Sequence, residues 1–295
     1  MERTTYALAL AYRGTGFAGW QRHPGRKTIQ GVLEDALASL LGERVQVHGA
    51  ARTDAGVHAD RQIASFSMRR SVDLATLRAL RLAEGVRILS AAAGAPAFHA
   101  RASAAGKRYR YRFAWGDSRA ADFWFLGADA QPRWEEARAA LESLRGLASL
   151  PGLSSPSSRR SEAPPFTSWS LEERSGRAEL TLSARAFRKH QIRNLAGHLA
   201  AVALDLAKPE SLEPLARSTR PWRGATAPPH GLTLVEVFYP SAVDPFRSSG
   251  ASQRNEPSGL VEAAGSEGLE IHAGEPEPGL PEHTGGFRAN GDQPG

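Results

Sequence analysis

Short segments with strand-like hydrophobic patterns alternate along the chain with longer segments in which apolar residues recur at helical spacing. In the first third of the chain, strands are predicted at residues 6–12, 45–48, 62–66 and 86–89. Apolar side chains recur every three or four residues from Ile29 to Leu40, after Thr28, which suits a helix N-cap, and before Gly42. A second helix is predicted at about 73–82. The order strand, helix, strand, strand, helix, strand is that of a ferredoxin-like half.

The second part of the chain repeats this order of elements. Residues 108–113 alternate strictly between Arg and aromatic residues, which places the aromatic side chains on one face of a strand and the arginines on the other. The further elements are a helix at 134–144, a hairpin of strands 168–173 and 178–183, a helix at 190–206 and a strand at 232–240. We therefore predict an α+β protein of two ferredoxin-like halves, residues 1–104 and 105–240, whose mixed or antiparallel sheets meet around a basic cleft.

Two segments lack both patterns. Residues 148–165 are rich in Ser, Pro and Arg, and we expect a long mobile insertion there. Residues 241–295 contain ten Gly, six Pro and an excess of Glu, but no apolar run longer than two or three residues. Such a segment cannot bury enough surface to offset the entropy of ordering, so we predict a disordered acidic tail.

Charge is distributed unevenly along the chain. The tail holds nine acidic and three basic residues, which gives it a net charge of −6. Because the whole chain has a net charge of +6, the first 240 residues carry +12. Of the 37 basic residues, 33 are arginine, whose planar guanidinium suits phosphate and stacks on bases. The excess favours a polyanionic partner, although an arginine bias of composition in an ordinary enzyme would produce the same numbers.

Composition excludes several kinds of chemistry. The chain has no Cys, which removes disulfide frameworks, thiolate nucleophiles, iron–sulfur clusters and Cys-ligated zinc. The nine His are scattered and no His-Glu-x-x-His motif occurs, so no metal site is predicted. No apolar run approaches the length of a membrane span, and the first residues do not have the pattern of a signal peptide. We therefore expect a cytoplasmic protein without membrane contact.

Residues 14–19 (Gly-Thr-Gly-Phe-Ala-Gly) match the fingerprint of dinucleotide-binding proteins letter for letter. In those proteins the third glycine lies on the helix that holds the pyrophosphate. Here eight residues, Pro24 and Gly25 among them, separate Gly19 from the helix start near Thr28. The motif is better explained as a turn that lets the following loop pack closely, and a flavin or nicotinamide enzyme is the weakest alternative.

Residues 50–58 (Ala-Ala-Arg-Thr-Asp-Ala-Gly-Val-His) place a carboxylate two residues after a guanidinium, in a short polar loop behind a predicted strand. Taken alone, Asp-Ala-Gly is often only a turn in which the Asp bonds to its own backbone. The wider pattern favours a functional interpretation, because five other segments accompany it: 12–21, 28–37, 98–111, 187–197 and 227–232. In order and spacing, these segments resemble the tRNA pseudouridine synthases of the TruA type over residues 4–240.

This resemblance implies a homodimeric enzyme, without cofactor or metal, that converts uridine to pseudouridine at positions 38 to 40 in the anticodon arm of tRNA. It implies that Asp54 is the catalytic aspartate and that Arg193 pairs with it. Arg52 and Tyr109 match further catalytic residues of the family and are expected to bind the substrate as well. Four more residues are candidates for substrate binding: Gln21, Arg22, Thr53 and His58.

The chemistry of the implied reaction explains why these residue types occur together. Exchanging an N1–C1′ bond for a C5–C1′ bond requires a nucleophile or base, and a carboxylate can add to the base or ribose or remove a ribose proton. The sequence leaves these routes open. A cation, assigned to Arg193, keeps a buried carboxylate charged. Tyr109 supplies a ring on which the detached uracil can turn and a hydroxyl that can assist proton removal from C5. Arg52 fills the place that the flipped base vacates, or it holds the flipped nucleotide.

Three departures from the family pattern leave a second function open. Ala51 replaces the usual Gly, residues 81–85 are shorter than the usual segment, and residues 147–158 lack the usual His-Asp-Phe-x-Ser-Phe. A catalytically impaired homologue that binds RNA is therefore the alternative to an active enzyme. Pseudouridine formation by the purified protein separates the two.

Overall fold

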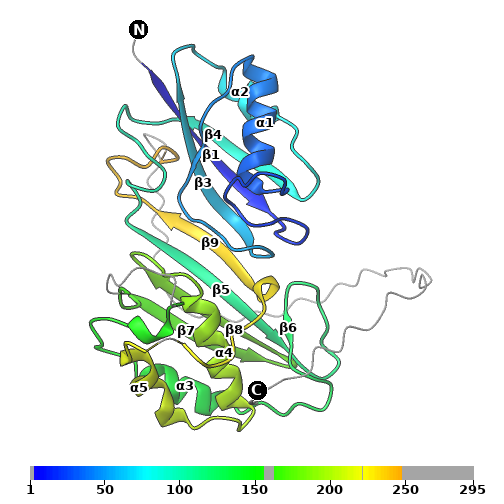
Figure 1. The fold of residues 1–295 in the computed structure, drawn as a ribbon, viewed down its shortest axis with the longest axis vertical. Helices are drawn as coiled ribbons and strands as arrows, with labels where there is room; N and C mark the ends of the chain where they lie inside the picture. The colour runs from blue at the N-terminus through cyan, green and yellow to red at the C-terminus, as the bar shows by residue number, and fades with distance from the viewer. Residues whose placement is uncertain (1–2, 156–162, 221, 248–295) are drawn as a thin grey trace, which may run out of the picture. The chain divides into compact units, whose positions relative to one another are not determined.

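The predicted strands join into one mixed sheet (Figure 1). The computed structural model describes residues 3–155, 163–220 and 222–247. Within them the strands are β1 Thr4–Tyr12, β2 His48–Gly49, β3 His58–Met68, β4 Val86–Ala93, β5 Gly106–Ala114, β6 Trp124–Phe125, β7 Ser168–Arg174, β8 Arg177–Ala184 and β9 Leu232–Phe238. Their order across the sheet is β4-β1-β3-β9-β5-β8-β7, with β2 paired to β3 and β6 paired to β5. The predicted α+β class is confirmed.

The sheet is continuous because β3 and β9 pair where the two predicted halves meet. This pairing is parallel and short, with His58 opposite Thr233 and Ala59 opposite Leu234. On its other side, β9 pairs with β5 in antiparallel orientation. We expected two sheets that meet around a cleft, and the structure has one sheet instead. The pairing satisfies backbone groups that two separate sheet edges would leave exposed.

The helices are α1 Ile29–Leu41, α2 Leu74–Ala79, α3 Trp134–Glu142, α4 Gln191–Ala203 and α5 Leu212–Arg217, with the short 3-10 helices η1 Pro151–Leu153, η2 Pro209–Ser211 and η3 Pro229–Gly231. In Figure 1, α1 and α4 lie in front of the sheet. The predicted ends of α1 are confirmed: Thr28 accepts a hydrogen bond from the Gly31 N–H, and Gly42 ends the helix at φ +72°. The helices predicted at 73–82, 134–144 and 190–206 are shorter than expected. None of the helices above has both the length and the apolar character of a membrane span.

The prediction of a strand at 45–48 is wrong except for its last residue. Only His48 enters β2. The backbone of Val47 bonds to side chains of α1 instead: its N–H donates to Glu34 Oε1 (3.0 Å), and its carbonyl accepts a hydrogen bond from Gln30 Nε2 (2.9 Å). Because these side chains satisfy the backbone of Val47, no neighbouring strand is needed there.

The segment 148–165 is packed at its start. Leu153 is fully buried, and its carbonyl accepts a hydrogen bond from the Asn194 side chain of α4 (2.8 Å). The prediction of a mobile insertion is wrong for this part, because apolar side chains among the Ser and Pro residues find places in the core. Residues 156–162 lie outside the described residues, as does the predicted tail beyond residue 247.

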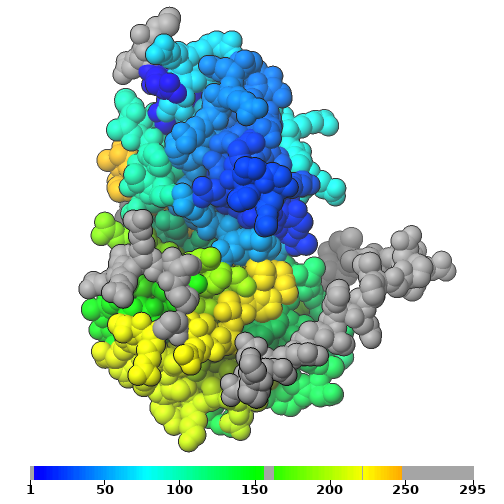
Figure 2. All heavy atoms as spheres, viewed as in Figure 1, coloured from blue at the N-terminus to red at the C-terminus, as the bar shows by residue number. Residues whose placement is uncertain are grey.

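Strand β5 has the two faces that its alternation predicts. Phe113 is fully buried and packs against Trp134 of α3, with ring centroids 4.8 Å apart. The arginines of the opposite face pair with acidic residues: Arg108 with Glu236, Arg110 with Asp60 and Glu179, and Arg112 with Glu179 and Asp122. In the space-filling view, the first half in blue to cyan adjoins the second half in green to yellow (Figure 2).

Candidate active site

Asp54 lies in the loop between β2 and β3, and the Gly-rich turn supports this loop. The Trp20 N–H donates to the Thr53 carbonyl (3.0 Å), and the Thr53 hydroxyl is hydrogen-bonded to the buried Tyr12 hydroxyl (2.8 Å). Gly19, at φ +92°, permits the close approach, since a Cβ atom there would lie 2.8 Å from the Thr53 carbonyl oxygen. The turn therefore packs closely, as the sequence indicated. Thr53 is buried and holds the loop that carries Asp54.

Helix α4 brings two nitrogen-bearing side chains to Asp54. Arg193 Nη1 lies 3.4 Å from Asp54 Oδ2, while Arg193 Nε donates to the Ala227 carbonyl (2.7 Å). His190, directly before the helix, places Nε2 3.5 Å from the same carboxylate oxygen. The Asp54 side chain is 33% exposed, so a ligand can reach it. In the described chain this side chain contacts α4 and forms no hydrogen bond to its own loop.

Tyr109 lies on the buried face of β5, where its ring packs edge-on against Phe187 with centroids 5.1 Å apart. Burial raises the pKa of Tyr109 far above its usual value, and electrostatic interactions with Tyr12 and Asp54 act in the same direction. The phenol therefore stays protonated at physiological pH. Its hydroxyl has no hydrogen-bond partner among the described residues, which leaves it available to a ligand.

Three basic side chains close to these residues in the chain have no acidic partner within the described residues. They are Arg52, Arg101 and Lys107. Arg52 lies two residues before Asp54, and Lys107 lies two residues before Tyr109. Burial and then the charge of Arg101 lower the pKa of Lys107, and burial and then the charge of Arg52 lower that of Arg101. Like charges gathered without a carboxylate suit an anionic ligand, because binding relieves their repulsion.

Arg22 and Gln21 lie on the exposed loop that follows the Gly-rich turn. Arg22 forms ion pairs with Glu34 (2.6 Å) and Asp35 (2.6 Å) of α1. Its guanidinium is therefore engaged in holding the loop to the helix. The contacts of Asp54 in the described chain include neither Arg22 nor Gln21, so the structure does not gather all predicted substrate-binding residues at one point.

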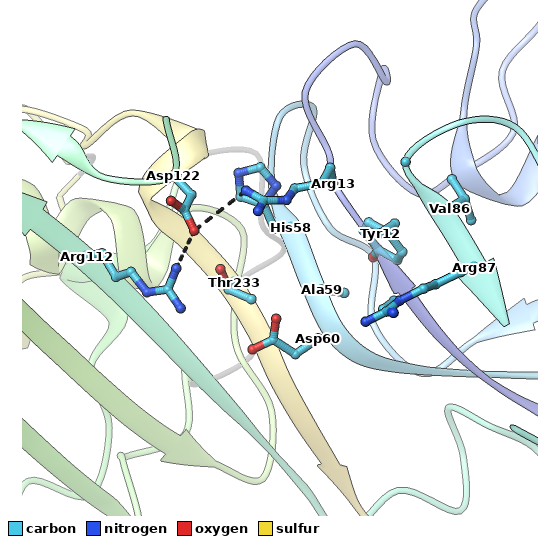
Figure 3. A pocket seen from close by; sticks show the side chains of 12 residues that line it. Tyr12, Arg13, His58, Ala59, Asp60, Val86, Arg87, Arg112, Asp122 and Thr233 are labelled. Atoms are coloured by element: carbon cyan, nitrogen blue, oxygen red, sulfur yellow. Dashed lines mark hydrogen bonds and ion pairs between the residues drawn. The ribbon is translucent and has the colours of Figure 1, made fainter. Parts of the chain in front are cut away.

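His58 lines a pocket that lies at the seam between β3 and β9 (Figure 3). The pocket measures about 440 Å³, and Asp54 does not line it. Asp122 lies there between Arg13 (3.7 Å) and Arg112 and pairs with both. His58 Nδ1 accepts a hydrogen bond from a backbone N–H of the Gly-rich turn (3.0 Å), and burial lowers the pKa of His58. His58 is therefore a neutral side chain built into the fold.

Sequence reasoning assigned no role to His190 or Lys107, although both lie in segments that it singled out. His190 precedes Arg193 by three residues, a spacing that brings side chains together at a helix turn. Lys107 precedes Tyr109 by two residues and so shares its face of β5. Spacing relative to the two predicted site residues is the signal that would have found them.

The arrangement suits carboxylate chemistry on an anionic substrate. A reachable carboxylate lies against an arginine and a histidine and acts electrostatically on the protonated Tyr109. Arg52 and Lys107, which have no acidic partner in the described chain, lie two residues before Asp54 and Tyr109 in the sequence. No group of three or more His, Asp or Glu side chains in the described part of the chain is placed to hold a metal ion.

Three known proteins whose sequences are similar to this chain share one name. The sequence model of a family described as tRNA pseudouridine synthase matches residues 159–240. The chain is 39% identical to tRNA pseudouridine synthase A of Methylococcus capsulatus over 249 residues, which cover 79% of this chain and 89% of the relative. It is 38% identical to the protein of that name from Myxococcus xanthus over 244 residues, 79% of this chain and 91% of the relative. The Methylobacterium nodulans protein is 34% identical over 258 residues, 80% and 96% of the two chains.

Proposed function

The chain belongs to the tRNA pseudouridine synthase A family and is an isomerase acting on tRNA, and from this we propose that it forms pseudouridine at positions 38 to 40 of the anticodon arm. The resemblance found in the sequence is thereby confirmed. The observation that carries the proposal is the reachable Asp54 carboxylate, 3.4 Å from Arg193.

The reaction is an isomerisation, so it consumes no oxidant, reductant or group donor, and we propose that it proceeds without a cofactor. The N1–C1′ bond breaks, the C5–C1′ bond forms, C5 loses its proton and N1 gains one. Asp54 is the nucleophile or base, because a carboxylate can attack a carbon or accept a proton. Its partial exposure is compatible with addition to the base or ribose and with removal of a ribose proton.

Tyr109 and Arg52 act on the uracil and on its place in the RNA. The Tyr109 ring, fixed by its contact with Phe187, is a surface on which uracil turns, and its hydroxyl assists the loss of the C5 proton. A base must leave its stack to reach Asp54, which costs a few kcal/mol. The exposed Arg52 offsets part of this cost by occupying the vacated place or holding the flipped nucleotide, and Arg101 and Lys107 attract the flanking phosphates.

The proposed scaffold is a pair of ferredoxin-like halves. In the first half β1 lies between β4 and β3, and β2 pairs with β3. In the second half β5 lies between β9 and β8, and β7 pairs with β8. This repeated order supports the proposal of two related units. We further propose that the enzyme is cytoplasmic and works as a homodimer. Sedimentation of the purified protein tests the oligomeric state.

The experiment is pseudouridine formation in tRNA transcripts that carry uridine at position 38, 39 or 40. Asp54→Asn keeps the shape of the side chain but removes its charge, so turnover should fall by several orders of magnitude while tRNA affinity stays within about tenfold. The control is Asp60→Asn, at an exposed aspartate of β3 that pairs with Arg110, and it should retain activity.

Two results would contradict the proposal. A parent protein that binds tRNA and forms no pseudouridine would establish the catalytically impaired RNA-binding alternative. Substantial isomerisation by the Asp54→Asn protein would show that another group performs the chemistry.

A further inference from the structure

Both nitrogen contacts of Asp54 are made to one carboxylate oxygen. Arg193 Nη1 (3.4 Å) and His190 Nε2 (3.5 Å) approach Oδ2, whereas Oδ1 forms no hydrogen bond or ion pair with the described chain. Arg193 is the counter-ion of the carboxylate. The proposed reaction assigns no task to His190, so its contact needs a separate explanation.

His190 has a backbone conformation that residues with side chains rarely adopt. It lies at φ +61° and ψ 0°, in the left-handed region, directly before α4. Hydrogen bonds hold the chain on both sides: the Asn194 N–H donates to the His190 carbonyl (2.8 Å), and the Ser155 N–H donates to the Lys189 carbonyl (3.0 Å). Strained conformations persist where the surroundings fix them, and they cluster at functional sites. Here the conformation brings the imidazole within 3.5 Å of Asp54.

We propose that His190 is a positioning residue for Asp54, an inference that rests on the proposed function. His190 and Arg193 hold Oδ2 together, so the carboxylate does not exchange its oxygens by rotation about the Cβ–Cγ bond, and Oδ1 is the oxygen that reacts. Arg193 is the counter-ion of the carboxylate, and His190 fixes the orientation of its two oxygens. Direction matters because a misplacement of about 1 Å can slow a reaction by about 10²-fold.

The groups around the imidazole favour its neutral form. Burial lowers the pKa of His190 most, Arg193 and Lys189 lower it further, and Asp54 opposes them. A neutral imidazole with its proton on Nε2 presents that N–H to Oδ2 at 3.5 Å without replacing Arg193 as the counter-ion. Protonation below this lowered pKa keeps the proton on Nε2, so the contact survives acidification.

The test uses variants that keep the left-handed backbone. Gly adopts this conformation freely and Asn tolerates it, so His190→Gly removes the imidazole and His190→Asn retains a short hydrogen-bond donor. The matched control is Asp205→Gly, because Asp205 has φ +59° beyond the other end of α4 and its side chain is 84% exposed. Each variant is compared with the parent protein in tRNA affinity, thermal unfolding and single-turnover pseudouridine formation at saturating tRNA.

We expect His190→Gly to slow the single-turnover reaction by about 10- to 100-fold, with tRNA Kd within about threefold of the parent and a melting temperature near that of Asp205→Gly. His190→Asn should recover part of the rate, and added imidazole should accelerate His190→Gly but not Asp205→Gly.

An unchanged rate in His190→Gly would overturn the proposal. So would a loss of tRNA affinity in proportion to the rate, because His190 would then be a contact to RNA. A parent protein that forms no pseudouridine would contradict the proposed function instead, so the two failures are distinguishable.

Discussion

Tyr109 combines a ring that Phe187 holds in place with a hydroxyl that has no partner in the described chain. Tyr109→Phe keeps the ring and removes the hydroxyl. Since proton transfer by a positioned side chain typically contributes about 10² to 10⁴ in rate, single-turnover pseudouridine formation should fall by that factor at unchanged tRNA affinity. The control is Tyr111→Phe, which removes a hydroxyl that donates to the Pro228 carbonyl and should affect stability more than rate. A Tyr109→Phe protein as fast as the parent would limit Tyr109 to stacking.

Helix α4 holds its position through close contact with the backbone after residue 224. A Cβ atom on Gly197 would lie 2.2 Å from the Ala225 carbonyl oxygen. The same segment fixes the helix start, since the Ala227 N–H donates to the Arg193 carbonyl (3.0 Å). Gly197→Ala should therefore destabilise the protein by about 1 to 3 kcal/mol in urea unfolding, although Ala is the better helix former, and should also lower the rate by displacing Arg193.

The control for this prediction is the reverse change at a partly exposed position of the same helix. Ala201→Gly should lose about 1 kcal/mol through helix propensity alone and leave the rate of pseudouridine formation unchanged. Equal stability of Gly197→Ala and the parent would mean that the segment after residue 224 can move away from α4 at little cost.

At the scale of the whole molecule, the charge divides near residue 247. Phe246 still packs against the folded part, with the Arg61 guanidinium 5.2 Å from its ring. Residues 248–295 hold eight acidic and two basic residues, so a chain ending at 247 carries +12. Its affinity for tRNA should equal or modestly exceed that of the full chain. For both proteins the log–log slope of affinity against salt should reach several units, because each neutralised phosphate contributes about −0.7 to −0.9.

Binding measured between about 50 and 200 mM salt checks this prediction, with circular dichroism as the test of folding. A flat salt dependence would contradict the assignment of arginine–phosphate contacts. A shortened protein that does not fold would show that the acidic segment contributes to the structure.

Stability should also fall at alkaline pH. Burial raises the pKa of Tyr12 to about 12 and that of Tyr109, Tyr111 and Tyr239 as well, whereas tyrosines of the unfolded chain ionise near pH 10. The stability linked to these groups is therefore complete below about pH 10 and is lost as pH rises toward the folded-state values. Ionisation of Tyr12 alone should lower the free energy of unfolding by about 1.4 kcal/mol at pH 11 relative to pH values below about 10. Urea unfolding at several pH values should show this loss, and Tyr12→Phe should reduce it.

Local signals were sufficient for part of this fold. Thr28 and Gly42 marked the ends of α1, and the alternation in residues 108–113 identified the two faces of β5. The joining of β3 to β9 was not predictable in this way, because it depends on two residue pairs far apart in the sequence. Val47 was misassigned for a related reason, since side chains of α1 took the place of a strand partner.

The candidate site shows the same division. The motifs marked Asp54 and Arg193, and the structure places them 3.4 Å apart. His190 depends on a left-handed backbone that no pattern of hydrophobic residues encodes. Arg22 was predicted to bind RNA because it is an arginine in a loop next to a motif, but Glu34 and Asp35 of α1 form ion pairs with its guanidinium. Sequence thus marked candidate residues for the proposed chemistry, whereas packing decided which of their side chains are engaged by other groups.

In the described part of the chain, β9 is the last strand, and it is synthesised after both of the strands with which it pairs. Since β9, at residues 232–238, pairs with both β3 and β5, a ribosome has translated past residue 238 before β3 meets this partner. A chain that ends before β9 therefore carries the Asp54 loop without the strand that joins β3 to β5. We therefore expect a chain that ends before residue 232 to form no pseudouridine.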